Sequence, residues 1–178
     1  MLKRFLVPFG LSVVFLLGTS QLVWAANPAT ITVTVTIQNL SVSATGPIAF
    51  GTVPAGSENV SGSASTVTND GNVTETYSLS LTNPGGWTAV QAPPGAEEYA
   101  LSAQFNSGAP TAASFTYADH ALSTTSVASS ATKFAGNQTG LSVPASATRS
   151  LWFRFNAPTS TIVTAQQSIT VTITAAAG

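Results

Sequence analysis

Alternation of apolar and polar side chains is the feature of this sequence that most constrains its fold. Apolar residues occupy most of the alternate positions in five runs, which cover residues 30–37, 73–81, 99–105, 151–155 and 169–173. Thr and Ser fill most of the positions between them. Because successive side chains of a strand point to opposite faces of a sheet, each run predicts a strand with one apolar and one polar face.

Turn-forming sequences separate these runs, and no segment after the first 25 residues has the apolar spacing of an amphipathic helix. The pair Asp70-Gly71 is the best hairpin signal, because both residues tolerate positive φ. The stretch 106–138 is less regular, and we expect long loops there around a strand at 114–117. The sequence predicts an all-β, two-sheet antiparallel sandwich, either immunoglobulin-like or a jelly-roll, with eight or nine strands and no substantial helix.

The composition excludes several classes of function. The 178 residues include only five Lys or Arg and six Asp or Glu, or 6% charged residues, against about 25% in an average domain. Five cations are too few for a nucleic-acid interface. The absence of cysteine rules out disulfides and Cys-based zinc sites.

The first 25 residues have the pattern of a signal peptide. Lys3 and Arg4 precede an apolar run at 5–17 that is shorter than a membrane span, and Val23-Trp24-Ala25 resembles a cleavage site. We expect cleavage after Ala25, or as second choice after Ala26, and a retained membrane anchor is the alternative. The protein is then secreted and extracellular or at the cell surface, with the periplasm also open, and makes no membrane contact after cleavage.

The start of the mature chain shows a break in the alternation. Residues 31–37 place apolar side chains at odd positions, whereas Leu40 and Val42 place them at even positions. A shift of one residue turns every side chain to the other face of a sheet. We therefore predict a signal peptide at 1–25, a separate N-terminal strand within 26–38 and a β-sandwich domain at 39–178, joined by a bulge or hinge.

Neither terminal strand carries protection against pairing with another chain. Residues 29–37 and 168–174 contain no Lys, Glu or Pro, which proteins use to blunt exposed sheet edges. The N-terminal strand either folds back on its own domain or inserts into a neighbouring subunit, which would make a homo-oligomer or homopolymer. The exchanged strand would contact its neighbour through four apolar residues: Ile31, Val33, Val35 and Ile37.

Several segments of this chain resemble those of known families of surface proteins. The segments IAFGTVPAGS (48–57), TVTNDGN (66–72), YSLSL (77–81), VPASATRSLWFRFNAP (143–158) and SITVTITA (168–175) resemble immunoglobulin-like β-sandwich modules of bacterial surface proteins. VWAA (23–26), PAGS, NDGN and LWFRF are similar to segments of TasA/camelysin-type matrix fibre subunits and archaeal bundling pilins. The second resemblance implies a secreted filament, pilus-like or biofilm-matrix subunit that assembles by donor strand exchange.

Exposed aromatic residues offer an alternative function. Trp152 alternates with the core-facing Leu151 and Phe153, so we expect it to point outward together with Arg154. Because sugars stack on exposed rings, Trp152 and Arg154 form a possible ligand platform. The alternative function is a secreted carbohydrate-binding or adhesive module, with polysaccharide as partner.

Catalytic and metal-binding patterns are weak. His120 is the only histidine, and its neighbour Asp119 would point to the opposite face of a strand. Glu97-Glu98, with Asp119 or Asp70, supplies too few oxygens for calcium. We expect no catalytic, cofactor-binding or metal site, and the protein is not predicted to be an enzyme or to bind nucleic acid.

Overall fold

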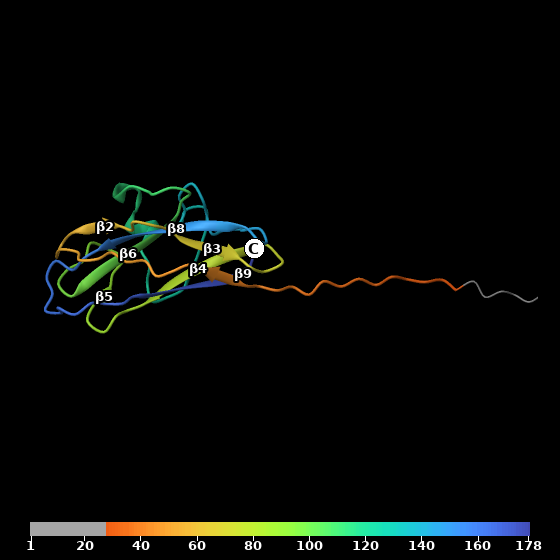
Figure 1. Cartoon of the computed structure of the whole chain (residues 1–178), viewed down its shortest axis with the longest axis horizontal. Coiled ribbons are helices and arrows are strands. Elements are labelled where there is room, and N and C mark those ends of the chain that lie inside the picture. Colours follow the sequence, from red (N-terminus) through yellow and green to blue (C-terminus); the bar gives the residue numbers. More distant parts are fainter. Residues whose placement is uncertain (1–27) are drawn as a thin grey trace, which may run out of the picture. The chain divides into compact units, whose positions relative to one another are not determined.

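The computed structural model describes residues 28–178, so the predicted signal peptide lies outside the described residues. Residues 36–178 form one compact unit, of which residues 28–35 are not part. Residues 36–178 fold into a two-sheet sandwich of nine strands (Figure 1), which confirms the predicted all-β class. None of the helices found within 28–178 is both long and apolar enough to cross a membrane.

The larger sheet contains the strands that form most of the core. Its order is β1 (Val42–Ala44), β3 (Ser65–Asn69), β8 (Thr148–Asn156), β6 (Glu98–Phe105) and β5 (Thr88–Ala89). The short β2 (Glu58–Val60) pairs with the C-terminal end of β8. All neighbours are antiparallel except β5 and β6, which are parallel.

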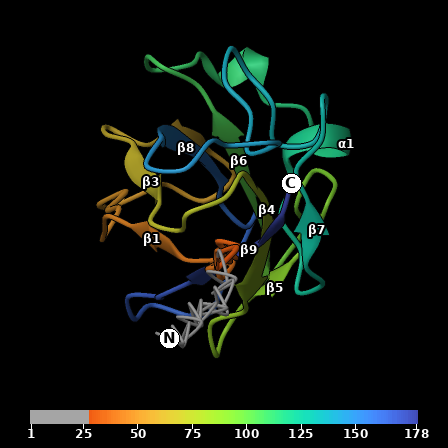
Figure 2. The same ribbon diagram turned by 90° about the vertical axis from the view of Figure 1, so that its right-hand side faces the viewer.

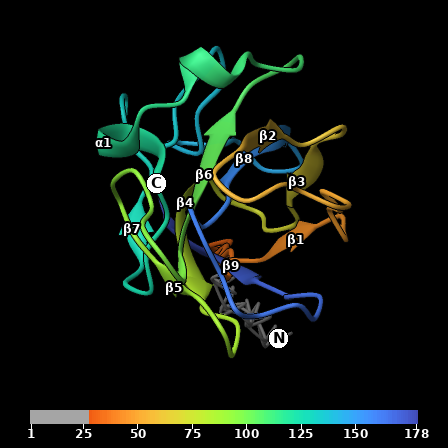
Figure 3. The same cartoon turned by 90° about the vertical axis from the view of Figure 1, so that its left-hand side faces the viewer.

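The second sheet has β4 (Glu75–Thr82) at its centre, between β7 (Val127–Ala128) and β9 (Thr170–Ala177). The β4–β9 ladder runs antiparallel from the Glu75–Ala177 pair to the Thr82–Thr170 pair. Figures 2 and 3 show β7 and β1 on opposite sides of β4. The sandwich therefore has two lateral seams, one beside β7 and one between β9 and β1.

Alternation along β4 builds the core as the sequence predicts. Tyr77, Leu79 and Leu81 are at most 3% exposed, while the Ser and Thr residues between them are more exposed. The three apolar side chains of β4 pack against inward-facing side chains of β6 and β8 in the larger sheet, among them Tyr99, Leu101, Phe105, Leu151, Phe153 and Phe155. Burial of these apolar faces is the main stabilising contribution to the sandwich.

The outer face of β6 departs from the predicted pattern. From Tyr99 to Phe105 every residue of β6 is buried, polar residues included, because the segment 106–138 covers the second face. The predicted strand at 114–117 is wrong. This stretch contains a 3₁₀ turn, η1 (Ala112–Ser114), and one turn of α-helix, α1 (Tyr117–His120). The Thr116 hydroxyl accepts a hydrogen bond from the Asp119 N–H and so caps this turn.

The hairpin predicted at Asp70-Gly71 is also wrong, because β3 and β4 lie in different sheets. The Asn69 side chain holds the chain in an arch between the sheets. Its amide donates to the carbonyls of Val73 and Val143, and its oxygen accepts from the Gly71 N–H at 2.9 Å. β3 and β4 therefore lie on opposite sides of the core, each with its apolar face inward, instead of side by side in one sheet.

The seam beside β7 is closed by the chain itself. Segment 121–140 bridges the two sheets: the N–H of Leu122 donates to Leu101 on β6, and the N–H of Ser129 donates to Tyr77 on β4. Leu122 and Phe134 are each 1% exposed and fill the space between the sheets.

Candidate functional site

The predicted N-terminal contact strand is extended but belongs to neither sheet. No residue between 28 and 41 lies in a strand. Ile31, Val33, Val35 and Ile37 are 87%, 85%, 82% and 75% exposed. Within the described chain this segment pairs with no strand of either sheet. A row of four neutral apolar side chains stays in contact with water.

The turn between β3 and β4 fixes the point at which this segment leaves the sandwich. The Asn72 side chain accepts a hydrogen bond from the Asn39 N–H and donates one to the Ile37 carbonyl, both at 2.8 Å. The N–H of Ser41 donates to the buried carboxylate of Glu75 at 2.7 Å. We call residues 37–41 with their partners Asn72 and Glu75 the exit clamp.

The seam between β9 and the segment 44–55 is open, and it forms an apolar groove of about 1160 Å³. Its floor includes Leu101, Phe153 and Phe155 from the larger sheet. One wall is β9 and the residues before it, and the other wall is 44–55, which contributes Ile48, Phe50 and Val53. We call this feature the β9 groove. None of its lining residues is charged.

Both walls of the β9 groove have free backbone groups. Within residues 28–178, β9 pairs with β4 alone, so its other edge has no partner strand. The backbone of 46–53 forms no hydrogen bond with the rest of the described chain. An open edge with unpaired N–H and C=O groups is a template for an added strand.

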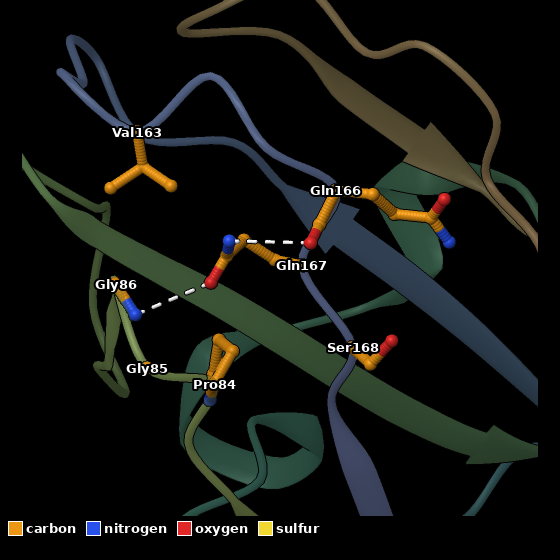
Figure 4. Close-up of a pocket in the computed structure, with 7 residues that line it drawn as sticks. All are labelled: Pro84, Gly85, Gly86, Val163, Gln166, Gln167 and Ser168. Carbon is orange, nitrogen blue, oxygen red and sulfur yellow. Dashed lines mark hydrogen bonds between the residues drawn. The ribbon is translucent and has the colours of Figure 1, made fainter.

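At the end of the β9 groove farthest from the exit clamp, the Gln167 side chain connects the loop before β9 to the turn 83–86. Figure 4 shows its side chain between the turn 83–86 and the loop before β9, where its oxygen accepts from the Gly86 N–H at 3.2 Å. The Trp87 indole N–H donates to the Thr161 hydroxyl at 3.0 Å, and its ring stacks on Phe155. This end is thus shaped by fixed polar contacts around an aromatic floor.

The structure does not bring Trp152 and Arg154 together as an exposed platform. Arg154 is 5% exposed because η1 and α1 cover it. Its guanidinium donates to the carbonyls of Ala112 and Phe115, and it lies 5.0 Å from the centre of the Tyr117 ring. Trp152 is half-buried, with its N–H donating to the Asn106 carbonyl. Arg154 lies on the outer face of β8 as expected, but the expectation that it is exposed there is wrong, because the sequence pattern does not show the covering segment.

His120 and the weak carboxylate candidates make contacts within the fold. The Nδ1 atom of His120 accepts from the Thr116 N–H at 2.9 Å, and its Nε2 atom lies 3.0 Å from the Ala135 carbonyl. Glu97 accepts from the Ile162 N–H, whereas Glu98 accepts from the Gly95 N–H. Across the described part of the chain, no three His, Asp or Glu residues gather as a metal site would require.

No family model, curated protein or solved structure matches this chain. The candidate site therefore rests on the geometry of the molecule itself. Sequence reasoning identified the exposed N-terminal row but missed the β9 groove. A signal was present in Ile48 and Phe50, which alternate as in a strand until Gly51 and Pro54 interrupt the pattern. In the structure this wall joins neither sheet.

Proposed function

We propose that this protein is a secreted structural subunit that self-associates into a filament through residues 31–37, with each copy covering this segment of the next. One observation supports the proposal above all others. Four apolar side chains at strand spacing are 75–87% exposed in a chain whose other long apolar alternations are at least partly buried. Exposed patches of this kind mark interaction sites.

The energetics favour covering this row with protein. Moving a Val or Ile side chain from water into a core stabilises by about 1.5–3 kcal/mol, and each main-chain hydrogen bond adds about 0.5–1.5 kcal/mol net. Thr32, Thr34 and Thr36 would face away from the covering surface, where their hydroxyls remain hydrated. No charge needs to be desolvated, because the segment has none.

The contact would be heterologous, because the N-terminal row and the sandwich that covers it are different surfaces. Such head-to-tail contacts repeat without closing unless the rotation between subunits completes a ring. We therefore favour a filament over a closed dimer. The signal-peptide pattern supports export, so the proposed filament would lie outside the cell or in the periplasm.

Deletion of the N-terminal segment tests the proposal. The chain that starts at Ala26 is compared with one that starts at Gln38, by negative-stain microscopy and sedimentation. We expect filaments from the first chain and a folded monomer from the second, with folding checked by circular dichroism. Unchanged assembly of the shortened chain would contradict the proposal.

A matched pair of substitutions separates the apolar row from the threonine row. Val35→Asp places a charge on the face that must be buried, whereas Thr34→Asp places the same charge on the hydrated face. We expect Val35→Asp to abolish filaments and Thr34→Asp to retain them. The proposal also fails if the unaltered chain remains monomeric at high concentration while NMR shows residues 30–37 mobile and hydrated.

A further inference from the structure

We infer that the β9 groove is the acceptor for the N-terminal segment of a second copy, which adds as a strand antiparallel to β9. In this arrangement Ile31 lies opposite Ile173 and Ile37 lies opposite Gln167. This inference rests on the proposed function and adds to it the location, the direction and the register of the contact.

The donor and the acceptor have the same spacing and length. Gln167, Ile169, Val171 and Ile173 line the groove and are each half-buried, with exposed residues between them. The donor offers four apolar side chains at the same period of two, at positions 31, 33, 35 and 37. A shift of one residue would turn its threonines toward the aromatic floor, so the face of the donor is specified.

The chemistry of the two surfaces also agrees. The groove and the donor are both uncharged, so pairing them leaves no buried charge without a partner. A strand has two edges, and here one would bond to the free edge of β9 while the other faces the unpaired backbone of 46–53. An added strand would thus provide hydrogen-bond partners that the single chain lacks on both walls.

The direction follows from where the donor leaves its own sandwich. The exit clamp includes Glu75, which pairs with Ala177, so the donor leaves at the end of the sandwich where β9 finishes. A segment that folded back into its own groove from there would run parallel to β9. A donor from a neighbour stacked head to tail enters at the opposite end, beside Gln167, and runs antiparallel to β9.

Paired cysteines distinguish the two directions, and the natural chain has none. In the antiparallel arrangement Thr32 lies directly opposite Thr172 on the hydrated face. In the fold-back arrangement with the same overlap, Thr36 lies opposite Thr172 instead. Chains carrying Thr32→Cys with Thr172→Cys, or Thr36→Cys with Thr172→Cys, are assembled in reductant, oxidised and separated on denaturing gels.

We expect a ladder of covalent multimers from the 32/172 pair and none from the 36/172 pair. A disulfide within the monomer, or a ladder from 36/172, overturns the inference. Filaments that form without cross-linking in either variant also overturn it, because the donor then lies elsewhere, while the proposed filament function stands. Absence of filaments from the natural chain counts against the proposed function itself.

A mixing experiment tests the groove independently of cysteine chemistry. Val35→Asp chains retain a groove but lose the donor, and Val171→Asp chains retain the donor but lose the groove. We expect each alone to stay monomeric and the mixture to give a 1:1 complex that stops at two subunits. Thr172→Asp, on the hydrated face of β9, is the folded control and should still polymerise. Filaments from Val171→Asp alone would overturn the inference.

Discussion

The two lateral seams of this sandwich are built from the same kinds of residues, but one is closed and the other is open. Beside β7, segment 121–140 fills the gap, pairs its backbone with both sheets and buries Leu122 and Phe134. Between β9 and β1, the backbone of 46–53 pairs with neither sheet and leaves the β9 groove open. The first seam is closed within one chain, whereas the second is open, and we propose that a strand from another copy fills it.

The difference shows how a single chain can be stable and still incomplete. The closed seam and the core bury their apolar side chains within one chain. The open seam keeps apolar groove residues only half-buried, so covering them in the proposed filament would add stabilisation that the single chain lacks. Stability of the monomer and stability of the filament should therefore depend on different residues.

The largest difference between the two seams should appear when one apolar side chain in each is truncated and the free energy of unfolding of the monomer is measured. We expect Leu122→Ala to lower the free energy of unfolding of the monomer by about 2–5 kcal/mol, because it leaves a cavity in a closed core. Ile173→Ala should cost the monomer about 1 kcal/mol, since its side chain is already half-exposed. Urea denaturation of chains that start at Gln38 measures both without assembly. Equal losses would mean that the two seams do not differ as described.

The loss of stability at alkaline pH should depend on the two buried tyrosines of the core, Tyr77 on β4 and Tyr99 on β6. Burial, together with a smaller contribution from the Glu75 carboxylate, raises the pKa of Tyr77 to about 12. Burial also raises the pKa of Tyr99, beside the aromatic floor of the groove, to about 12. Between pH 10 and 12 the unfolded chain releases these protons while the folded chain keeps them, so stability is full below pH 10 and falls as the pH rises.

On the order of 1–3 kcal/mol per tyrosine should be lost across this window, given about 1.4 kcal/mol for each pKa unit. Denaturation midpoints measured from pH 9 to 12 check the slope. Tyr77→Phe and Tyr99→Phe should each make it shallower, and a slope unchanged in both variants would assign alkaline unfolding to other groups.

The sequence predicts the strands that face one shared core, because alternation records burial on one side. Residues 75–82, 98–105, 148–156 and 170–177 are strands close to the predicted positions. Alternation does not record which strand lies beside which. The turn at Asp70-Gly71 therefore predicts a hairpin, although Asn69 and the shared core place β3 and β4 in separate sheets.

The candidate site divides in the same way. The donor row could be predicted because it is one continuous run in the sequence. The groove could not, because its floor, walls and far end come from five separated segments that only the fold brings together. Arg154 fails for a related reason: a distant loop covers it, and the pattern of its own strand carries no trace of that loop.

The segment over the outer face of β6 should depend on Arg154. We expect Arg154→Leu to lower the free energy of unfolding by about 1–3 kcal/mol, because the Ala112 and Phe115 carbonyls lose their donor. Its ion-pair partner Glu58, 3.7 Å away, is half-exposed and stays hydrated, which limits the loss. Arg154→Lys keeps the charge but not the planar stacking on Tyr117. An unchanged free energy of unfolding in Arg154→Leu would show that apolar contacts alone hold the segment 106–138 on the outer face of β6.

The smallest effect on monomer stability should come from the exit clamp. Asn72→Ala removes two exposed hydrogen bonds and should cost about 1 kcal/mol. In the proposed filament the same bonds would connect the donor to its own sandwich, so their loss should let neighbouring subunits bend and shorten the persistence length seen by microscopy. Asn72→Asp keeps the acceptor for the Asn39 N–H and should lie between Ala and the natural residue. Equal stiffness in all three would mean that the joint between subunits is held by the groove rather than by the clamp.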